Sequence, residues 1–381
     1  MRLEKLLADS VALRVLNIPD PPSTIEKVPL GDSSSTPTRL AVLFSGGLDC
    51  TVLARLAHSL LPISEPIDLL NVAFQNPRIH KTTDDDEQSY LAAFESCPDR
   101  QWRFVAINVP YTETVAHRDT IITLMHPHNT EMDLSIACAL YFAARGTGLM
   151  TTNQASASAH LPQPYTTQAR VLLSGLGADE LFAGYTRHAT AYNRYGFQGL
   201  LDELNLDIGR LGKRNLGRDD RAITNWGKEA RFPFLDESLV AWALAAPVSD
   251  KCDFGASENT DGDLSAQLES CKKVLRCLAW RLGIHKVAAE KKRAVRSHVG
   301  TQHHDNIANS ILDPIRRPHG KNDNRQNKRH NTPILTHAPR THRYVTSAFP
   351  SLQLPAHGDE AEHCNRGASL HRYFRAVFLD G

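Results

Sequence analysis

Two short glycine-containing segments carry the residue types needed to bind phosphate. In the first, LFSGGLD at residues 43–49, Gly46 and Gly47 allow a sharp turn and a close backbone approach to a ligand, and Ser45 adds a hydroxyl donor. The unpaired N–H groups of a following helix would point at an anion. Asp49 would be repelled by bare phosphate, so it predicts a bridging Mg²⁺. No Lys follows the glycines, so this is not a Walker A motif.

The second segment, VLLSGLGADELFAGY at residues 171–185, repeats this pattern with Ser174, Gly175 and Asp179. Each segment follows an expected strand, and ligands of open α/β sheets bind beyond the carboxyl ends of strands. Asp49 and Asp179 could therefore share one metal between two phosphates. The alternative is a pair of tight strand–helix turns whose acids are surface charges.

The elements around these segments alternate between strands and helices. The expected strands are residues 40–44, 67–74, 104–110 and 171–174, and the expected helices include 49–61, 119–125 and 132–145. This alternation predicts an α/β fold, a mainly parallel sheet with flanking helices. After Tyr185 the strand signal fades, and residues 186–290 have helical periodicity. We expect a helical C-terminal subdomain packed on the sheet.

Three regions differ in composition. Residues 1–38 form an N-terminal segment and a Pro/Ser/Thr-rich linker, and residues 39–295 form the domain. Residues 296–381 carry 12 Lys+Arg, 7 Asp+Glu and 10 of the 18 His without apolar periodicity, which predicts a low-order tail. A metal-binding or nucleic-acid arm, and a shifted reading frame or splice near residue 295, are the alternatives.

The overall composition excludes several classes of protein. Lys+Arg number 43 and Asp+Glu 42, so no global field attracts nucleic acid or a membrane. No apolar run approaches the ~20 residues of a membrane span, and the charged N-terminus is not a signal peptide. The seven Cys contain no CxxC pair, which argues against a disulfide framework or structural zinc and favours a reducing, cytoplasmic location.

Three ordered motifs resemble one enzyme family. The SGGLD segment resembles the pyrophosphatase loop of the N-type ATP pyrophosphatases, with Cys50 at a position usually held by Ser. The SGLGADELFAGY segment resembles the second signature of asparagine and β-lactam synthetases, and residues 217–236 resemble their GxExRxPFLD signature. Over about residues 1–295 the chain resembles the eukaryotic asparagine-synthetase-domain-containing proteins. This resemblance implies a PP-loop, adenine nucleotide alpha hydrolase-like fold.

The resemblance also implies roles for individual residues, with ATP and Mg²⁺ as cofactors. Leu43 and Val72 would border the adenine. Ser45, Gly46, Gly47 and Asp49 would hold the pyrophosphate end. Ser174 and Gly175 would lie near the AMP moiety, and Asp49 and Asp179 would bind Mg²⁺. Tyr185 and Lys292 are the catalytic candidates, with Lys272 as a second candidate for the cation at the α-phosphate. Glu229, Arg231 and Asp236 would brace the helical subdomain.

The implied activity is an ATP-dependent amide-forming ligase with aspartate and ammonia as the expected small-molecule substrates. Three departures bear on it. Residue 2 is Arg rather than the Cys of a glutaminase domain, so a separate glutaminase or protein partner is left open. Leu176 replaces a Glu of asparagine synthetases, and VRSHVGTQHH follows the lysine run at Lys292. The alternatives are a degenerate relative that binds nucleotide without turnover, and a tRNA sulfur-transfer enzyme, which the acidic body of the chain disfavours.

Overall fold

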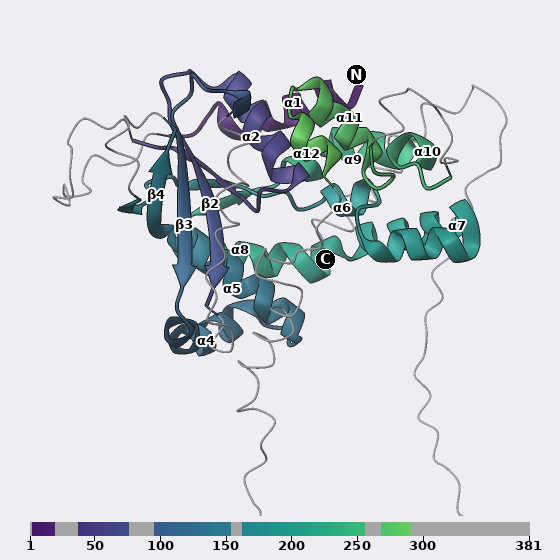
Figure 1. The fold of residues 1–381 in the computed structure, drawn as a ribbon. Coiled ribbons are helices and arrows are strands. Elements are labelled where there is room, and N and C mark those ends of the chain that lie inside the picture. Colours follow the sequence, from purple (N-terminus) through teal and green to yellow (C-terminus); the bar gives the residue numbers. More distant parts are fainter. Residues whose placement is uncertain (1, 20–36, 76–94, 154–161, 256–267, 291–381) are drawn as a thin grey trace, which may run out of the picture.

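The computed structural model describes residues 2–19, 37–75, 95–153, 162–255 and 268–290 (Figure 1). Most of the expected linker, the expected tail 296–381 and Lys292 lie outside these described residues. Among the helices that are described, none combines the length and the apolar character that a membrane crossing requires.

One seven-stranded sheet forms the centre of the fold, in the order β5-β4-β3-β2-β1-β6-β7. Strands β3, β2, β1, β6 and β7 are parallel, and β4 and β5 are added antiparallel at one edge. The mainly parallel sheet is confirmed. The strand bounds are β1 Leu40–Leu43, β2 Ile67–Phe74, β3 Trp102–Val109, β4 Thr147–Thr152, β5 Gln163–Thr166, β6 Val171–Leu173 and β7 Glu229–Arg231.

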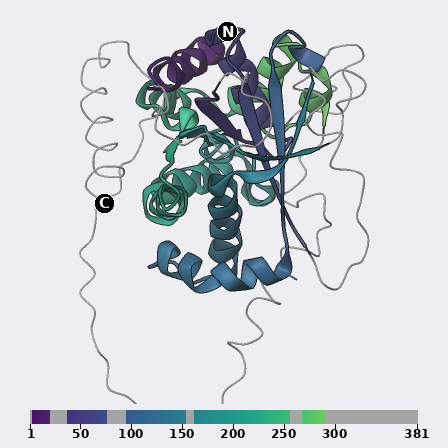
Figure 2. The ribbon, with the colours of Figure 1, turned by 90° about the vertical axis from the view of Figure 1, so that its left-hand side faces the viewer.

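Helices cover both faces of this sheet. Strand residues Leu40 and Val42 point into one core cluster with α1, α2, α9, α11 and α12, while Ala41 points into a second cluster with α4, α5 and α8. Helix α4 lies across the end of β2 and β3 (Figures 1 and 2). The helix bounds are α1 Arg2–Val15, α2 Leu48–Leu60, α4 Tyr111–Met125, α5 Glu131–Arg145, α6 Ala178–Leu181, α7 Thr186–Leu211, α8 Gly217–Thr224, α9 Glu237–Ala245, α10 Val248–Lys251, α11 Lys273–Arg281 and α12 His285–Ala289.

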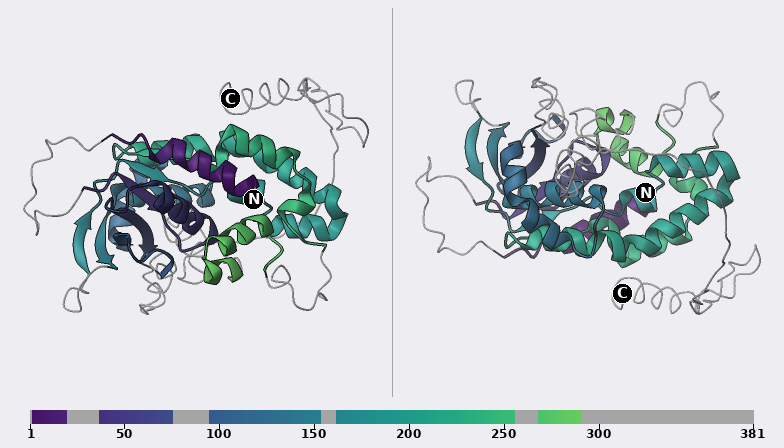
Figure 3. Two further views of the ribbon diagram at one scale, coloured as in Figure 1. Left: turned by 90° about the horizontal axis from the view of Figure 1, so that it is seen from above. Right: turned by 90° about the horizontal axis from the view of Figure 1, so that it is seen from below.

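Helix α1 shares the core of the sheet domain. Its buried residues Leu3, Leu7, Val11 and Val15 recur every four positions, which places them on one helix face. That face packs against α2, α9 and α11, and Figure 3 shows α1 beside the dark α2. The Ser10 hydroxyl also donates to the Pro233 carbonyl at 2.6 Å. The N-terminal helix is therefore joined to elements more than 200 residues away.

The signature around residues 229–236 braces this junction with α1, whereas it was expected to brace the helical subdomain. Arg231 Nε donates to Glu229 Oε1 at 2.9 Å, and its Nη1 donates to the carbonyl of Arg14 in α1 at 2.6 Å. Arg14 Nη1 in turn lies 3.1 Å from Asp236 Oδ2. Asp236 also accepts from the Ser238 N–H at 3.0 Å and so caps α9. These contacts are structural and lie between α1, β7 and α9.

The helical region after Tyr185 begins with the long helix α7, which is kinked at Gly196 (φ 65°). Its second half packs Leu200 and Leu204 against Val248 and Cys252. The expectation that strands end before this region is wrong at one place, because β7 adds a parallel strand beside β6. With three residues of sequence EAR, β7 is too short and too polar to show a strand pattern.

Candidate functional site

The first glycine turn joins β1 to α2. The Phe44 N–H donates to the Leu70 carbonyl at 2.8 Å, which holds the end of β1 beside β2. Gly46 then takes a positive φ of 74°, a region in which glycine carries no steric cost. Gly47 is the N-cap of α2, and Ser45 is exposed. The turn therefore presents a helix N-terminus and a hydroxyl to any anion that binds there.

Cys50 fills the position at which a serine was expected. Its side chain is 4% exposed, and its Sγ donates to the Gly47 carbonyl at 3.2 Å. Sγ also lies 3.6 Å from Ser45 Oγ. Burial raises the pKa of this thiol, so it stays protonated. Cys50 therefore supports the turn from inside.

The second glycine turn lies directly beside the first. Strands β1 and β6 are neighbours in parallel register, with Val42 opposite Leu173. The strand order reverses at β1, which makes this edge the switch point where α/β sheets bind ligands. The turns approach so closely that a Cβ on Gly175 would lie 3.1 Å from Asp49 Cβ. Two segments about 125 residues apart in the sequence thus form one surface, as the alternation of strands predicts.

The two candidate carboxylates meet at a lysine ammonium. Lys272 Nζ lies 2.6 Å from Asp49 Oδ2 and 2.8 Å from Asp179 Oδ1. The lysine side chain is 5% exposed, and the aspartates are 22% and 18% exposed. Burial alone would lower the pKa of Lys272, but Asp49 and Asp179 outweigh it and hold this pKa above its usual value. We call Asp49, Asp179 and Lys272 the ion triad.

Gly184 makes room for the ion triad. A Cβ at this position would lie 1.8 Å from Asp179 Oδ1 and 2.1 Å from Lys272 Cε, far inside any van der Waals contact. Sequence reasoning missed this residue. The signal was present as the glycine of the AGY run, but the lysine that needs the space is almost 90 positions later.

Tyr185 is turned toward the protein interior. Its hydroxyl donates to Glu180 Oε1 at 2.7 Å, and Glu180 is 4% exposed. Burial raises the pKa of Glu180, and burial together with nearby carboxylates raises the pKa of Tyr185. The Tyr185 N–H also donates to His188 Nδ1 at 3.2 Å, while His188 Nε2 lies 2.8 Å from Asp207 Oδ2. Tyr185 thus anchors the start of α7 next to Asp179.

The remaining predicted residues fall near the same edge. Leu43 and Val72 end up on one face of the sheet, because Leu43 pairs with Leu70 and Val72 is two residues further along β2. Both are partly buried against the second core cluster. The Leu176 N–H donates to Ser174 Oγ at 3.3 Å, and its side chain is half-buried. The expected Lys292 lies outside the described residues, so Lys272 is the cation that the structure places here.

The triad offers a metal two carboxylates and no third protein ligand. Within the described ranges, no group of three or more His, Cys, Asp or Glu side chains could hold an ion. Mg²⁺ needs about six oxygen ligands and usually takes several from water and substrate phosphates. Two carboxylates beside a turn that suits phosphate therefore fit a metal that arrives with a nucleotide.

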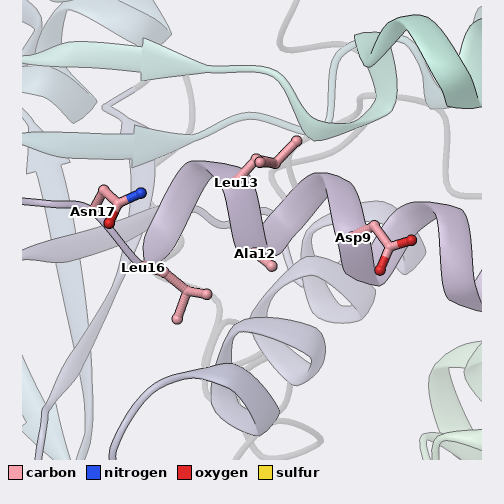
Figure 4. A pocket seen from close by; sticks show the side chains of 5 residues that line it. All are labelled: Asp9, Ala12, Leu13, Leu16 and Asn17. Atoms are coloured by element: carbon pink, nitrogen blue, oxygen red, sulfur yellow. The ribbon is translucent and has the colours of Figure 1, made fainter.

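A shallow hollow on the outer side of α1 is separate from this site. It is lined by Asp9, Ala12, Leu13, Leu16 and Asn17 (Figure 4). Leu13 and Leu16 are 70% and 54% exposed, and Asp9 is its one charged side chain. The hollow shares no residue with the glycine turns or the ion triad, so it adds nothing to the chemistry there.

Comparisons with known proteins agree with the motifs. The profile of the asparagine synthase family matches residues 33–202 and 196–332. Asparagine synthetase domain-containing protein 1 of Bos taurus is 36% identical over 337 residues, which cover 76% of this chain and 50% of the relative. The Gallus gallus protein of that name is 37% identical over 299 residues, which cover 68% of this chain and 45% of the relative. The chain spans about half the length of these relatives.

A shorter match reaches a protein named as a glutamine-hydrolysing enzyme. The putative asparagine synthetase [glutamine-hydrolyzing] 1 of Methanocaldococcus jannaschii is 49% identical over 82 residues, or 22% of this chain and 15% of that protein. The higher identity over a shorter segment indicates that the likeness is concentrated in part of the domain.

Proposed function

Because this chain belongs to the asparagine synthase family, we propose that it is an ATP-dependent ligase that forms an amide. In this reaction an oxygen of the substrate carboxylate attacks the α-phosphorus of ATP, and pyrophosphate leaves. Ammonia then attacks the acyl carbon of the acyl-adenylate, and AMP leaves. Aspartate is the proposed carboxylate, and ammonia is the proposed nitrogen donor.

The residues of the two turns supply binding and charge neutralisation rather than acid–base chemistry. The N–H groups at the start of α2 and the Ser45 hydroxyl would bind the pyrophosphate end, where the helix dipole favours negative charge. Leu43 and Val72 would provide an apolar surface for the adenine. Asp49 and Asp179 would hold Mg²⁺, which when bound neutralises phosphate charge.

Lys272 is the residue we propose for charge stabilisation during adenylation. Its ammonium lies between the two carboxylates at 2.6 and 2.8 Å, and it is held cationic by them. A cation held next to the phosphate site can stabilise the negative charge that develops there. The convergence of Asp49, Asp179 and Lys272 beside the two glycine turns is the observation that carries the proposal.

The test is ATP–pyrophosphate exchange with aspartate and with other small carboxylates. Exchange that depends on both Mg²⁺ and a carboxylate is the expected result, since adenylation is reversible. Asp179→Asn should lower the exchange rate by at least tenfold. Asp119→Asn is a matched control, because Asp119 is an exposed carboxylate on α4 whose side chain is 96% exposed. Equal rates for Asp179→Asn and the parent would contradict the metal role.

One observation favours a second function, nucleotide binding without turnover. Leu176 lies in the second turn, where its apolar side chain can pack but cannot orient ammonia. A protein that binds Mg·ATP yet shows no exchange with any carboxylate would support this alternative and contradict the ligase.

A further inference from the structure

Lys272 reaches the site from an unusual backbone position. It is the N-cap of α11 and has a left-handed φ of 53°, a conformation that non-glycine residues rarely adopt. Its N–H donates to the Phe182 carbonyl at 3.0 Å, which ties it to the second glycine turn. A cation at a helix N-terminus is also disfavoured by the helix dipole. A lysine is therefore unfavourable at this backbone position, and the contacts of its ammonium group must compensate.

The ammonium contributes by neutralising both candidate metal ligands. Nζ contacts one oxygen from each of Asp49 and Asp179, so the triad carries a net charge of one negative unit instead of two. Gly184 closes over the lysine stem and leaves it little room, because even a methyl group there would collide with Lys272 Cε. A free divalent cation that approaches this pair of carboxylates meets an ammonium already bound between them.

We propose that Lys272 is a positioning residue that occupies the place of the metal in the nucleotide-free protein, so that a divalent cation binds only together with a nucleotide. The nucleotide phosphates would supply new partners for the ammonium and the missing oxygen ligands for the metal. The proposal rests on the proposed function for its nucleotide half. The other part of the proposal, that Lys272 excludes free metal, depends only on residues that the structure describes.

The experiment measures binding of Mn²⁺ to the protein from the electron paramagnetic resonance signal of the free ion, after subtraction of a protein-free titration because the nucleotide itself binds Mn²⁺. The parent should bind Mn²⁺ at least about tenfold more tightly with α,β-methylene-ATP than without it, since couplings between linked sites typically span 5- to 150-fold. Lys272→Met should gain Mn²⁺ binding without nucleotide by a similar factor.

Lys273→Met is the matched control. Lys273 is the adjacent lysine, and its ammonium contacts Asp253, which is outside the triad. This variant should leave Mn²⁺ binding unchanged. Circular dichroism of each variant shows whether it is folded, and the comparison of the parent with and without nucleotide stands even if Lys272→Met does not fold.

Two outcomes would overturn the proposal. One is a parent that already binds Mn²⁺ without the nucleotide as tightly as Lys272→Met does, and the other is a folded Lys272→Met that gains no Mn²⁺ binding. Either can occur while carboxylate-dependent exchange persists, so the ligase proposal would survive it. If Lys272→Met gains metal binding but no protein binds nucleotide, exclusion by Lys272 is supported and the ATP chemistry fails.

Discussion

Replacing Gly184 with alanine tests whether the ion triad is needed as a unit. The added methyl group would lie 1.8 Å from Asp179 Oδ1 and 2.1 Å from Lys272 Cε. Ordinary contacts between such atoms exceed about 3 Å, so one side chain must move by roughly 1 Å or more. Gly184 has no positive φ, so backbone strain does not add to the effect. We expect the ion pair between Lys272 Nζ and Asp179 Oδ1, at 2.8 Å in the parent, to separate.

The size of the effect follows from the burial of this pair. Removing one partner of a buried ion pair costs about 3–5 kcal/mol, and the partial exposure of Asp179 favours the lower end, about 3 kcal/mol. For a domain of 150–250 residues this corresponds to a fall in Tm of about 6–12 °C. If the same geometry binds Mg·ATP, affinity should fall by roughly 100-fold.

Thermal unfolding with and without Mg·ATP measures both quantities. Gly217→Ala is the comparison, since Gly217 begins α8 with helical φ and an added Cβ would meet only the Arg221 guanidinium, at 2.9 Å, a milder clash than the two at Gly184. Its effect on Tm should be clearly smaller than that of Gly184→Ala, because the helix propensity gained from alanine offsets part of the contact. A Gly184→Ala protein with the parent's Tm and nucleotide affinity would refute the reasoning that the triad needs this space.

Three further predictions use other parts of the molecule. Asp49→Asn should weaken Mg·ATP binding at least tenfold in a titration while Tm changes little, because the amide oxygen still accepts from Lys272. Burial, with nearby Arg cations, lowers the pKa of His58 to about 4. Stability from His58 is thus present above its unfolded pKa of about 6.5 and lost as pH falls toward 4. In His58→Gln, the free energy of unfolding measured with urea should therefore change less between pH 6.5 and 4 than in the parent. Leu176→Glu should raise ammonia-dependent asparagine formation, which mass spectrometry measures. The Tm of the variant is measured as well, to show that it is folded.

Each of these has a result that would contradict it. An Asp49→Asn protein with unchanged Mg·ATP affinity would remove the metal role. Equal pH dependence in parent and His58→Gln would show that Arg100 Nε, 3.0 Å from His58 Nδ1, does not need a neutral acceptor. A folded Leu176→Glu variant that binds ATP without any gain in amide formation would count against asparagine as the product.

The candidate site could be predicted from the sequence where its signals are local. The Gly46 turn, the strands on either side and the Asp49–Asp179 proximity all follow from short patterns and from the geometry of parallel strands. Lys272 remained one of two candidates, because no local pattern tells which lysine side chain crosses to another loop. Gly184 could be recognised only after Lys272 was placed beside it.

Parts of the fold were missed for a related reason. Strand β4 is TGLMTT and β5 is QPYT, short edge segments that are partly exposed and lack a clear apolar pattern. The Pro/Ser/Thr-rich stretch after α1 separates that helix from the rest of the sequence, although α1 is packed into the common core. Such packing depends on partners that only the folded chain brings near.

The packing of α1 bears on how the chain is synthesised. Helix α1 is synthesised well before part of its packing surface, because its apolar face is completed by Phe234, Leu239 and Leu275, which lie more than 200 residues later in the chain. Its hydrogen bond from Ser10 to Pro233 spans 223 residues. Translation adds about 5–20 residues per second, so the residues that pack on the apolar face of α1 are synthesised at least about ten seconds after it. We expect the nascent chain to need a chaperone over this interval.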